Sequence, residues 1–120
     1  MGIIKQTVKL NGKSVLALID SGAETSFILE SLAKKLGMKK GKRVKVYLGD
    51  GTRRYGYEVV GLITIDKQRL PIKLVAVKNL GGDKLVIGAD FLQLMDYIID
   101  FKGDKIKIKK QKYNYKGYRL

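Results

Sequence analysis

The hydrophobic and polar positions along the chain predict mainly short strands. Residues 3–10 alternate imperfectly between apolar and polar side chains, and Asn11-Gly12 after them is a strong hairpin signal. Residues 14–19 are nearly all apolar, which is typical of a strand buried on both faces. The same criteria predict further strands over residues 44–48, 55–65, 70–77, 98–101 and 105–109, and residues 85–88 form a short apolar run that ends in Gly.

Two short helices interrupt this pattern. The first has apolar residues at helical spacing: Leu29, Leu32, Ala33 and Leu36. Ser26 is a candidate N-cap for it, and Gly37 stands where a left-handed C-cap is expected. Residues 89–95 predict one or two further helical turns. Many short strands, tight turns and few helices favour an all-β fold, either a compact barrel or a sandwich.

The composition excludes several kinds of chemistry. The 120 residues predict one domain and contain no His, Cys or Trp, so imidazole bases, thiolate nucleophiles and Cys/His metal sites are excluded. Catalysis would depend on the eight Asp and three Glu residues, or on Lys and Tyr. No signal sequence or membrane-spanning apolar run is evident, and we therefore expect a soluble, cytoplasmic protein that does not bind a membrane.

The charge is unusually positive. The net charge is +14, and residues 102–120 hold eight basic residues against Asp104 as the one acid. Residues 110–120 interleave three tyrosines with cations, a composition that suits single-stranded nucleic acid. A solubilising terminus, or tyrosines packed on the folded domain, explains the same composition.

A candidate site lies at the end of the apolar run. Asp20-Ser21-Gly22-Ala23 follows Leu18-Ile19 directly, and a carboxylate there needs hydrogen bonds or a partner that shares its charge. Asp-Ser-Gly is also common turn chemistry, so these residues taken alone favour a turn. A second segment, Val86-Ile87-Gly88 followed by the helical residues 89–95, lies about 65 residues later along the chain.

Together these two segments resemble the retropepsin-like aspartic proteases, the retroviral-type proteases and their cellular relatives. In that family an apolar pair precedes the catalytic Asp-Thr/Ser-Gly-Ala, and a later apolar-apolar-Gly run threads beside it. The family also has a flap hairpin between them, which matches residues 44–65 with a turn at Gly49-Asp50-Gly51. The resemblance implies an acid-protease β barrel with one or two short helices over residues 1–109, followed by a basic extension at 110–120.

The resemblance also implies a homodimeric endopeptidase that hydrolyses peptides or proteins without a metal or cofactor. Two aspartates share one proton, and a water is activated between them. Neither Asp50 nor Asp100 is followed by Ser/Thr-Gly, so the second catalytic aspartate would be Asp20 of another copy. Cleavage is then expected to be favoured at acidic to mildly acidic pH.

Further roles follow from the same resemblance, residue by residue. Ser21 would hydrogen-bond across the dimer axis, and Gly22 would let the substrate backbone approach. Ala23 and Ile87 would line apolar subsites, while Glu24 would hydrogen-bond the substrate main chain. The flap tip over residues 48–55 would close over the peptide; its expected substrate-binding residues are Leu48, Gly49, Asp50 and Gly51.

Two alternatives stay open. The chain could instead be a non-catalytic dimerisation module that binds peptide or nucleic acid through its basic surface. Arg53 and Arg54 stand in the predicted flap, where the viral enzymes are glycine-rich and apolar. Such residues would either favour acidic residues in a substrate or simply solvate the tip of a hairpin.

Overall fold

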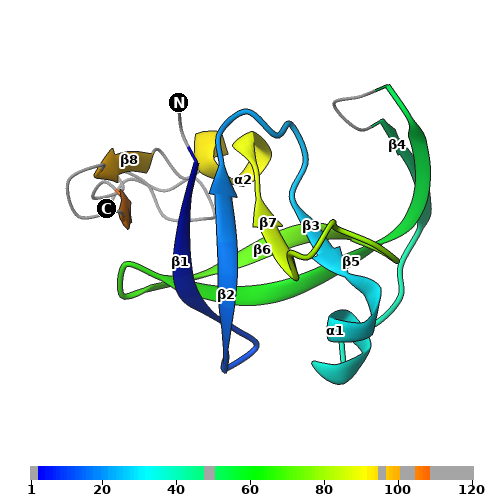
Figure 1. The fold of residues 1–120 in the computed structure, drawn as a ribbon. Helices are drawn as coiled ribbons and strands as arrows, with labels where there is room; N and C mark the ends of the chain where they lie inside the picture. Colours follow the sequence, from blue (N-terminus) through cyan, green and yellow to red (C-terminus); the bar gives the residue numbers. More distant parts are fainter. Residues whose placement is uncertain (1–2, 48–50, 95–96, 101–104, 109–120) are drawn as a thin grey trace.

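The structure is a computed structural model that describes residues 3–47, 51–94, 97–100 and 105–108 (Figure 1). Within them the chain forms mainly strands. The strands are β1 (Ile3–Leu10), β2 (Lys13–Asp20), β3 (Phe27–Leu29), β4 (Arg43–Tyr47), β5 (Arg53–Ile65), β6 (Gln68–Val77), β7 (Leu85–Ile87), β8 (Tyr97–Asp100) and β9 (Lys105–Ile108). The two helices are α1 (Glu30–Lys35) and α2 (Ala89–Leu94).

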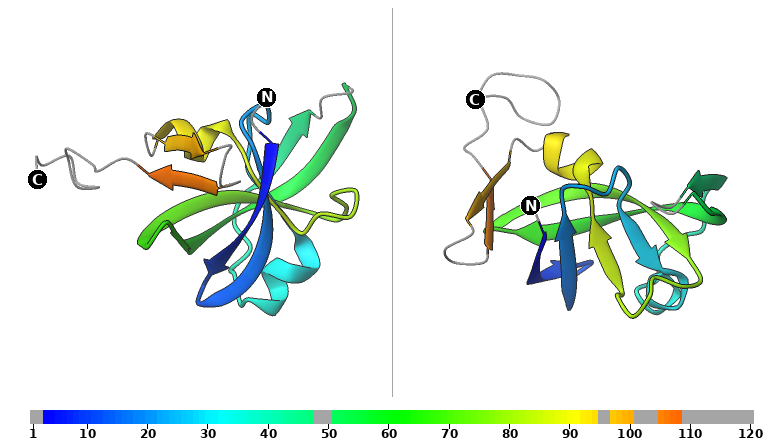
Figure 2. Two further views of the ribbon diagram at one scale, coloured as in Figure 1. Left: turned by 60° about the vertical axis from the view of Figure 1, so that its left-hand side comes forward. Right: turned by 45° about the horizontal axis from the view of Figure 1, so that its top comes forward.

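Six strands close into a barrel in the order β1-β2-β7-β3-β6-β5. The ring is closed because β5 also pairs with β1, through Lys9 opposite Thr64 and Leu10 opposite Ile63. The fourth strand pairs with β5 outside this ring, so the β4–β5 hairpin projects from the barrel (Figure 2). A separate two-stranded sheet pairs β8 with β9. The expected all-β barrel with few, short helices is confirmed.

The first hairpin forms as its sequence predicts. Asn11 and Gly12 have φ angles of 50° and 79°, the two left-handed residues that a tight two-residue hairpin requires. The strands on either side then pair over their full length, from Ile3 opposite Asp20 to Leu10 opposite Lys13. The side chain of Asn11 also accepts a 2.9 Å hydrogen bond from the Leu62 N–H, which ties this turn to β5.

The second strand is buried on one face, and the expectation that both faces are buried is wrong. Val15, Ala17 and Ile19 point into the barrel, whereas Leu16 between them is 56% exposed. Successive side chains of a strand point to opposite faces, so an apolar run becomes buried on both faces only where another layer covers it. On the outer face of β2 only Leu18, near the end of the strand, packs against other apolar side chains.

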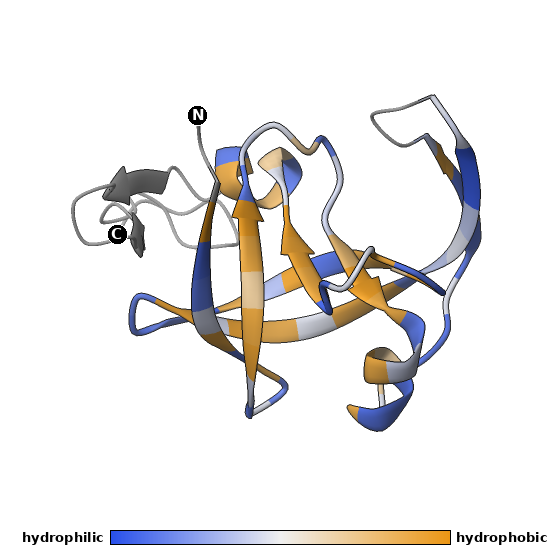
Figure 3. Cartoon of the chain, in the orientation of Figure 1, coloured by the Kyte–Doolittle hydropathy of each residue, from blue (hydrophilic) through white to orange (hydrophobic). Residues whose placement is uncertain are grey.

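The core consists of two apolar clusters. The first fills the barrel and includes Leu10, Ile19, Ile63, Leu74 and Ile87, all fully buried or nearly so. The second apolar cluster lies where β3, β6 and β7 meet β4, and Figure 3 shows the apolar residues of β3 and β7. Its buried members are Phe27, Val75, Val77 and Val86, and the half-buried side chains packed on them are Leu18, Ala23, Val44, Val46 and Leu80.

The first helix begins later than its apolar spacing predicts. Residues 27–29 form β3, which pairs with both β6 and β7, and Leu29 with extended backbone precedes the helix. Ser26 therefore does not cap the helix, whose N-cap makes no side-chain hydrogen bond. The predicted end is confirmed: Gly37 has a φ of 70°, and the N–H groups of Gly37 and Met38 donate to the carbonyls of Lys34 and Ala33.

Candidate active site

Asp20 is the last residue of β2 and lies where the chain leaves the barrel. The half-buried carboxylate accepts a 2.9 Å hydrogen bond from the Gly22 N–H through its Oδ1 atom. The Asp20 carbonyl accepts a second bond, 3.1 Å long, from the Ala23 N–H. These two bonds form a tight turn that holds the carboxylate at the end of the barrel. Both interpretations of the motif are therefore compatible: the segment is a turn, and it presents a carboxylate.

Gly22 leaves the approach to this carboxylate open. The residue is exposed, and a Cβ atom added to it would lie 3.2 Å from Asp20 Oδ1. Any other residue here would therefore place its side chain against the oxygen that the Gly22 N–H holds. Because glycine has no Cβ atom, no side-chain carbon lies against this carboxylate oxygen.

The segment after β7 threads beside the Asp20 turn, as the sequence predicts. The β7 strand runs parallel to β2, with Leu18 opposite Val86 and Ile19 opposite Ile87. Gly88 follows directly, and a Cβ atom there would lie 2.5 Å from the Ala23 carbonyl oxygen and 2.7 Å from that of Thr25. The Ala89 N–H donates a 2.6 Å bond to the same Ala23 carbonyl. The loop between β2 and β3 thus wraps over Gly88, and the two segments interlock.

A polar network that the sequence did not reveal fixes this crossing. Ser26 is fully buried, and its hydroxyl donates a 2.6 Å hydrogen bond to Asp90 Oδ1 while accepting a 2.8 Å bond from the Gly88 N–H. The Ser26 N–H donates to Asp90 Oδ2 at 3.1 Å, and the Phe91 N–H donates to Asp90 Oδ1 at 2.7 Å. Both carboxylate oxygens of Asp90 therefore accept hydrogen bonds that stabilise the fold. Locally it resembles any acidic residue in the first turn of a helix, so its sequence gave no signal of this role.

The remaining predicted site residues divide into three groups. Ser21 is half-buried and Glu24 is exposed, both in the loop that follows Asp20. Ala23 packs on the second apolar cluster, as a residue lining an apolar surface would. Gly51 is exposed with a φ of 85°, whereas Leu48, Gly49 and Asp50 lie outside the described residues.

Ile87 differs from its expected place. It is fully buried in the barrel core and presents no surface that could line a subsite. Strand side chains alternate, so its neighbour Val86 points to the other face and joins Ala23 in the second apolar cluster. Val86 is the β7 residue that sequence reasoning missed on this face.

The β4–β5 hairpin has two different faces. Val44 and Val46 pack on the second apolar cluster and so define its inner face. Arg54 stands opposite Val46 across the two strands, which places it on that inner face, and it is exposed. Arg53 is paired with Tyr47 and belongs to the outer face. In Figure 1 the hairpin rises on the same side of the barrel as the loop between β2 and β3.

The described residues hold no group of three or more His, Cys, Asp or Glu side chains that could bind a metal ion. A hollow of about 220 Å³ is lined by Glu30, Ser31, Lys34 and Lys78 and includes none of the site residues. In the part of the chain that the structure describes, no helix is long and apolar enough to cross a membrane.

Solved structures with this fold include three of different origin. The retroviral protease-like domain of Ddi1 from Leishmania major is 20% identical, with a TM-score of 0.68 over 92% of this chain and 91% of that chain. A retropepsin-like aspartic protease from Rickettsia conorii is 22% identical, with a TM-score of 0.64 over 87% and 80%. The EIAV protease, bound to an inhibitor, is 17% identical, with a TM-score of 0.62 over 74% and 84%. At these identities the likeness shows a shared fold.

The family of the chain is identified from its sequence. No curated protein matches the chain. The family model described as gag-polyprotein putative aspartyl protease matches residues 6–94, which include both Asp20 and the crossing at Gly88. The chain therefore belongs to the gag-polyprotein aspartyl protease family.

Proposed function

We propose that the chain is one half of a homodimeric aspartic endopeptidase in which Asp20 meets Asp20 of a second copy. The observation that carries the proposal is the Asp20 turn: a carboxylate presented at the barrel end by its own loop, which is locked over Gly88. The family match and the retropepsin-like fold support the same conclusion. Nothing in this arrangement requires a histidine or a metal.

The chemistry of such a pair follows from its charge. Two carboxylates a few ångströms apart do not both ionise readily, so the pair holds one proton between them. The ionised member would take a proton from water, and the protonated member would donate to the carbonyl oxygen of the scissile peptide bond. The water oxygen would bond to the carbonyl carbon and give a gem-diol intermediate. The newly protonated aspartate would then donate its proton to the amide nitrogen as the C–N bond breaks, while the other aspartate takes a proton from one gem-diol hydroxyl, so the products are a carboxylic acid and an amine and the pair again holds one proton.

A single chain presents only half of this pair. Asp90 is the carboxylate tied to the same loop, but hydrogen bonds from Ser26 and Phe91 engage both of its oxygens. The second catalytic carboxylate would therefore come from another copy across a two-fold axis. Ser21 would then hydrogen-bond across that axis, and Glu24, exposed beside it, would bind the substrate main chain.

The hairpin would act as the flap of the enzyme. Its inner face covers the second apolar cluster, so a peptide bound beside Asp20 would contact Ala23, Val46 and Arg54. Val46 would contribute apolar contact and exclude water, while the Arg54 guanidinium would pair with an acidic side chain. We therefore propose substrates with an acidic residue near the scissile bond.

The experiment is proteolysis of a peptide library by the wild type and the Asp20→Asn variant, with the oligomeric state of both measured by sedimentation. We expect Asp20→Asn to remain folded and to lose about a thousandfold or more in cleavage rate. Asp66→Asn, in the β5–β6 turn, makes the same chemical change away from the site and should retain full activity. Cleavage that persists in Asp20→Asn would overturn the proposal, and a dimer without cleavage would favour a non-catalytic binding module.

A further inference from the structure

The outer face of the β4–β5 hairpin carries a regular pattern of cations and tyrosines. Every second cross-strand pair joins one cation to one tyrosine: Arg43 with Tyr57, Lys45 with Tyr55 and Tyr47 with Arg53. Directly paired residues of antiparallel strands lie on the same face, and so do residues two apart along one strand. We call these six residues the cation–tyrosine face.

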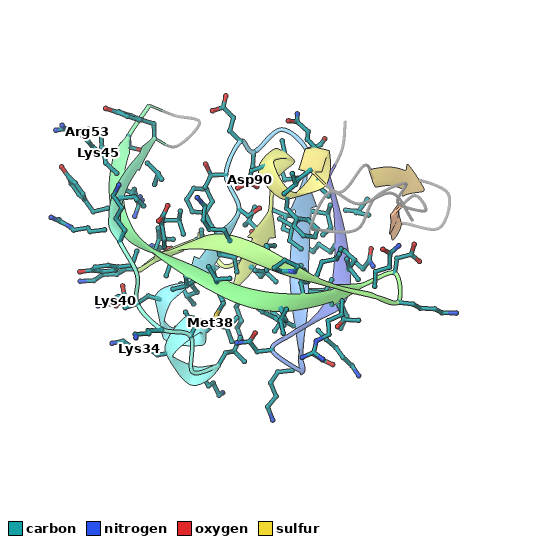
Figure 4. All side chains as sticks on the ribbon, turned by 180° about the vertical axis from the view of Figure 1, so that it is seen from behind. Lys34, Met38, Lys40, Lys45, Arg53 and Asp90 are labelled. Carbon is teal, nitrogen blue, oxygen red and sulfur yellow. The ribbon has the colours of Figure 1, made fainter. Side chains whose placement is uncertain are left out.

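Two of the three rings of this face lie against a cation. The Arg43 guanidinium lies over the Tyr55 ring, 4.3 Å from its centroid, and the Lys40 ammonium lies over Tyr57 at 4.0 Å. Both distances are within the range of cation–π attraction. Tyr47 and Tyr55 nevertheless remain 66% and 52% exposed, so their rings present free surface. Figure 4 labels Lys40, Lys45 and Arg53 along this outer side of the hairpin.

The proposed protease activity does not use this face. Val44 and Val46 of the same strand point to the second apolar cluster, so the cation–tyrosine face is directed away from it. Folding alone does not account for the face either, because exposed tyrosines there add little to the core. Several exposed rings on one face of two strands indicate a binding surface.

The charge of the hairpin identifies the kind of partner. Residues 39–57 contain seven basic residues and one acid, Asp50. The next acid along the chain, Glu58, pairs instead with Lys73 at 3.4 Å. A surface of this sign attracts polyanions. Arg43 and Lys45 are two residues apart on β4, which places them about 7 Å apart because strand residues rise by about 3.4 Å, and Arg53 adds a cation from β5.

We propose that the cation–tyrosine face binds single-stranded nucleic acid. Bases would stack on Tyr47 and Tyr55, while Arg43, Lys45 and Arg53 would neutralise the phosphates. An acidic peptide would use the cations and leave the rings without a role, whereas a nucleic acid strand offers a stacking surface and a charge at every step. Stacking and phosphate contacts do not select a base, so the binding would tolerate many sequences.

The first test removes equal charge from two places in the full chain. Fluorescein-labelled oligo(dT) of about 15 nucleotides is titrated with wild type, with Arg43→Gln/Lys45→Gln/Arg53→Gln, and with Lys5→Gln/Lys9→Gln/Lys13→Gln. Lys5, Lys9 and Lys13 are exposed on β1 and β2, outside the hairpin. The hairpin variant should bind at least tenfold more weakly and show a smaller salt dependence, while the control changes less than threefold. Equal weakening in both variants would overturn the proposal.

The second test separates stacking from charge. Tyr55→Ala should weaken oligo(dT) binding about fivefold or more, and Tyr55→Phe should retain it because the ring remains. Val60→Ala, which removes a side chain of similar exposure from the same strand, should have no effect. Binding unchanged in Tyr55→Ala, or displaced equally well by polyglutamate of the same charge, would overturn the proposal. All variants keep residues 109–120, so that basic segment contributes equally throughout.

Discussion

Ser26 and Asp90, 64 residues apart in the sequence, form a hydrogen-bonded pair in which the buried hydroxyl donates to the carboxylate over 2.6 Å. The pair joins the loop that carries Asp20 to the first turn of α2. Since Gly88 lies beneath the same loop and donates to Ser26, three segments are fixed at one point. The position of the candidate catalytic carboxylate therefore depends on a polar network that does not include it.

Asp90→Ala should destabilise the protein substantially. The variant leaves the Ser26 N–H and hydroxyl without their acceptor, and Ser26 is fully buried. Losing hydrogen bonds to a charged group and leaving buried donors unpaired should cost about 2–4 kcal/mol of unfolding free energy. Chemical denaturation monitored by circular dichroism measures this change.

Asp90→Asn is the matched variant for that network. Its amide keeps one acceptor oxygen for the Ser26 hydroxyl and places a nitrogen where Oδ2 now accepts from the Ser26 N–H. We expect the unfolding free energy of this variant to lie between that of Asp90→Ala and that of the wild type. If all three proteins unfold at the same denaturant concentration, the network does not stabilise the fold.

Gly88→Ala should disturb the crossing beneath the Asp20 loop. The added methyl group would meet two backbone carbonyl oxygens at 2.5 and 2.7 Å, and backbone atoms held in an interlocked loop have little room to move. The expected loss is about 2–3 kcal/mol, measured as a lower melting temperature.

Gly22→Ala provides the comparison within the same loop. Its methyl group would lie 3.2 Å from Asp20 Oδ1 and meet no other atom within 4 Å outside its chain neighbours. This variant should fold with nearly normal stability but cleave peptides poorly, because the methyl group occupies the approach to the carboxylate. A Gly88→Ala protein as stable as Gly22→Ala would contradict the close contacts.

The sequence predicted what depends on local chemistry. Asn11-Gly12 formed its hairpin and Gly37 its helix end, because a positive φ is favoured by these residue types wherever they occur. The partnership of Leu18-Ile19 with Val86-Ile87 was also predictable, but only through the family pattern.

What the sequence could not predict depends on contacts between distant segments. Ser26 is of a residue type that is common at helix N-caps. It becomes a buried link only because Asp90 and Gly88, which lie far along the chain, form hydrogen bonds with it. Leu29 fits a helical stripe, yet β3 pairs with two strands and draws it into the barrel. Ile87 and Val86 are equally apolar, and the register with β2 alone decides which faces the core.

Arg54→Leu should change the substrate preference of the proposed protease. Arg54 shares the inner face of the hairpin with Val44 and Val46, so its loss should lower kcat/KM for peptides with an acidic residue near the cleaved bond. A partly solvated ion pair of this kind corresponds to about a three- to fivefold effect. The effect is measured as the ratio of kcat/KM for two peptides that differ only in carrying Glu or Gln at that position.

Arg53→Leu is the control for this prediction. It removes the same charge from the adjacent position, whose side chain belongs to the outer face opposite Tyr47. The ratio of kcat/KM for the Glu and Gln peptides should therefore stay at its wild-type value. Equal changes in both variants would indicate a general effect of charge rather than a contact on the inner face.

Dimerisation of the free protein should strengthen as salt is added. Each subunit carries a net charge of +14, so two subunits repel each other before their contacts form. The Debye length falls from about 10 Å at 0.1 M salt to about 3 Å at 1 M, which screens this repulsion while contacts inside the interface are affected less. Sedimentation equilibrium from 50 to 500 mM sodium chloride measures the dimer constant, and the variant Lys9→Gln/Lys13→Gln reports on long-range charge. Lys9 and Lys13 flank the Asn11-Gly12 turn, at the opposite end of the β1–β2 hairpin from Asp20, so their loss should favour the dimer at low salt without touching the proposed axis. A dimer constant that is the same at every salt concentration would show that local contacts, and not net charge, govern assembly.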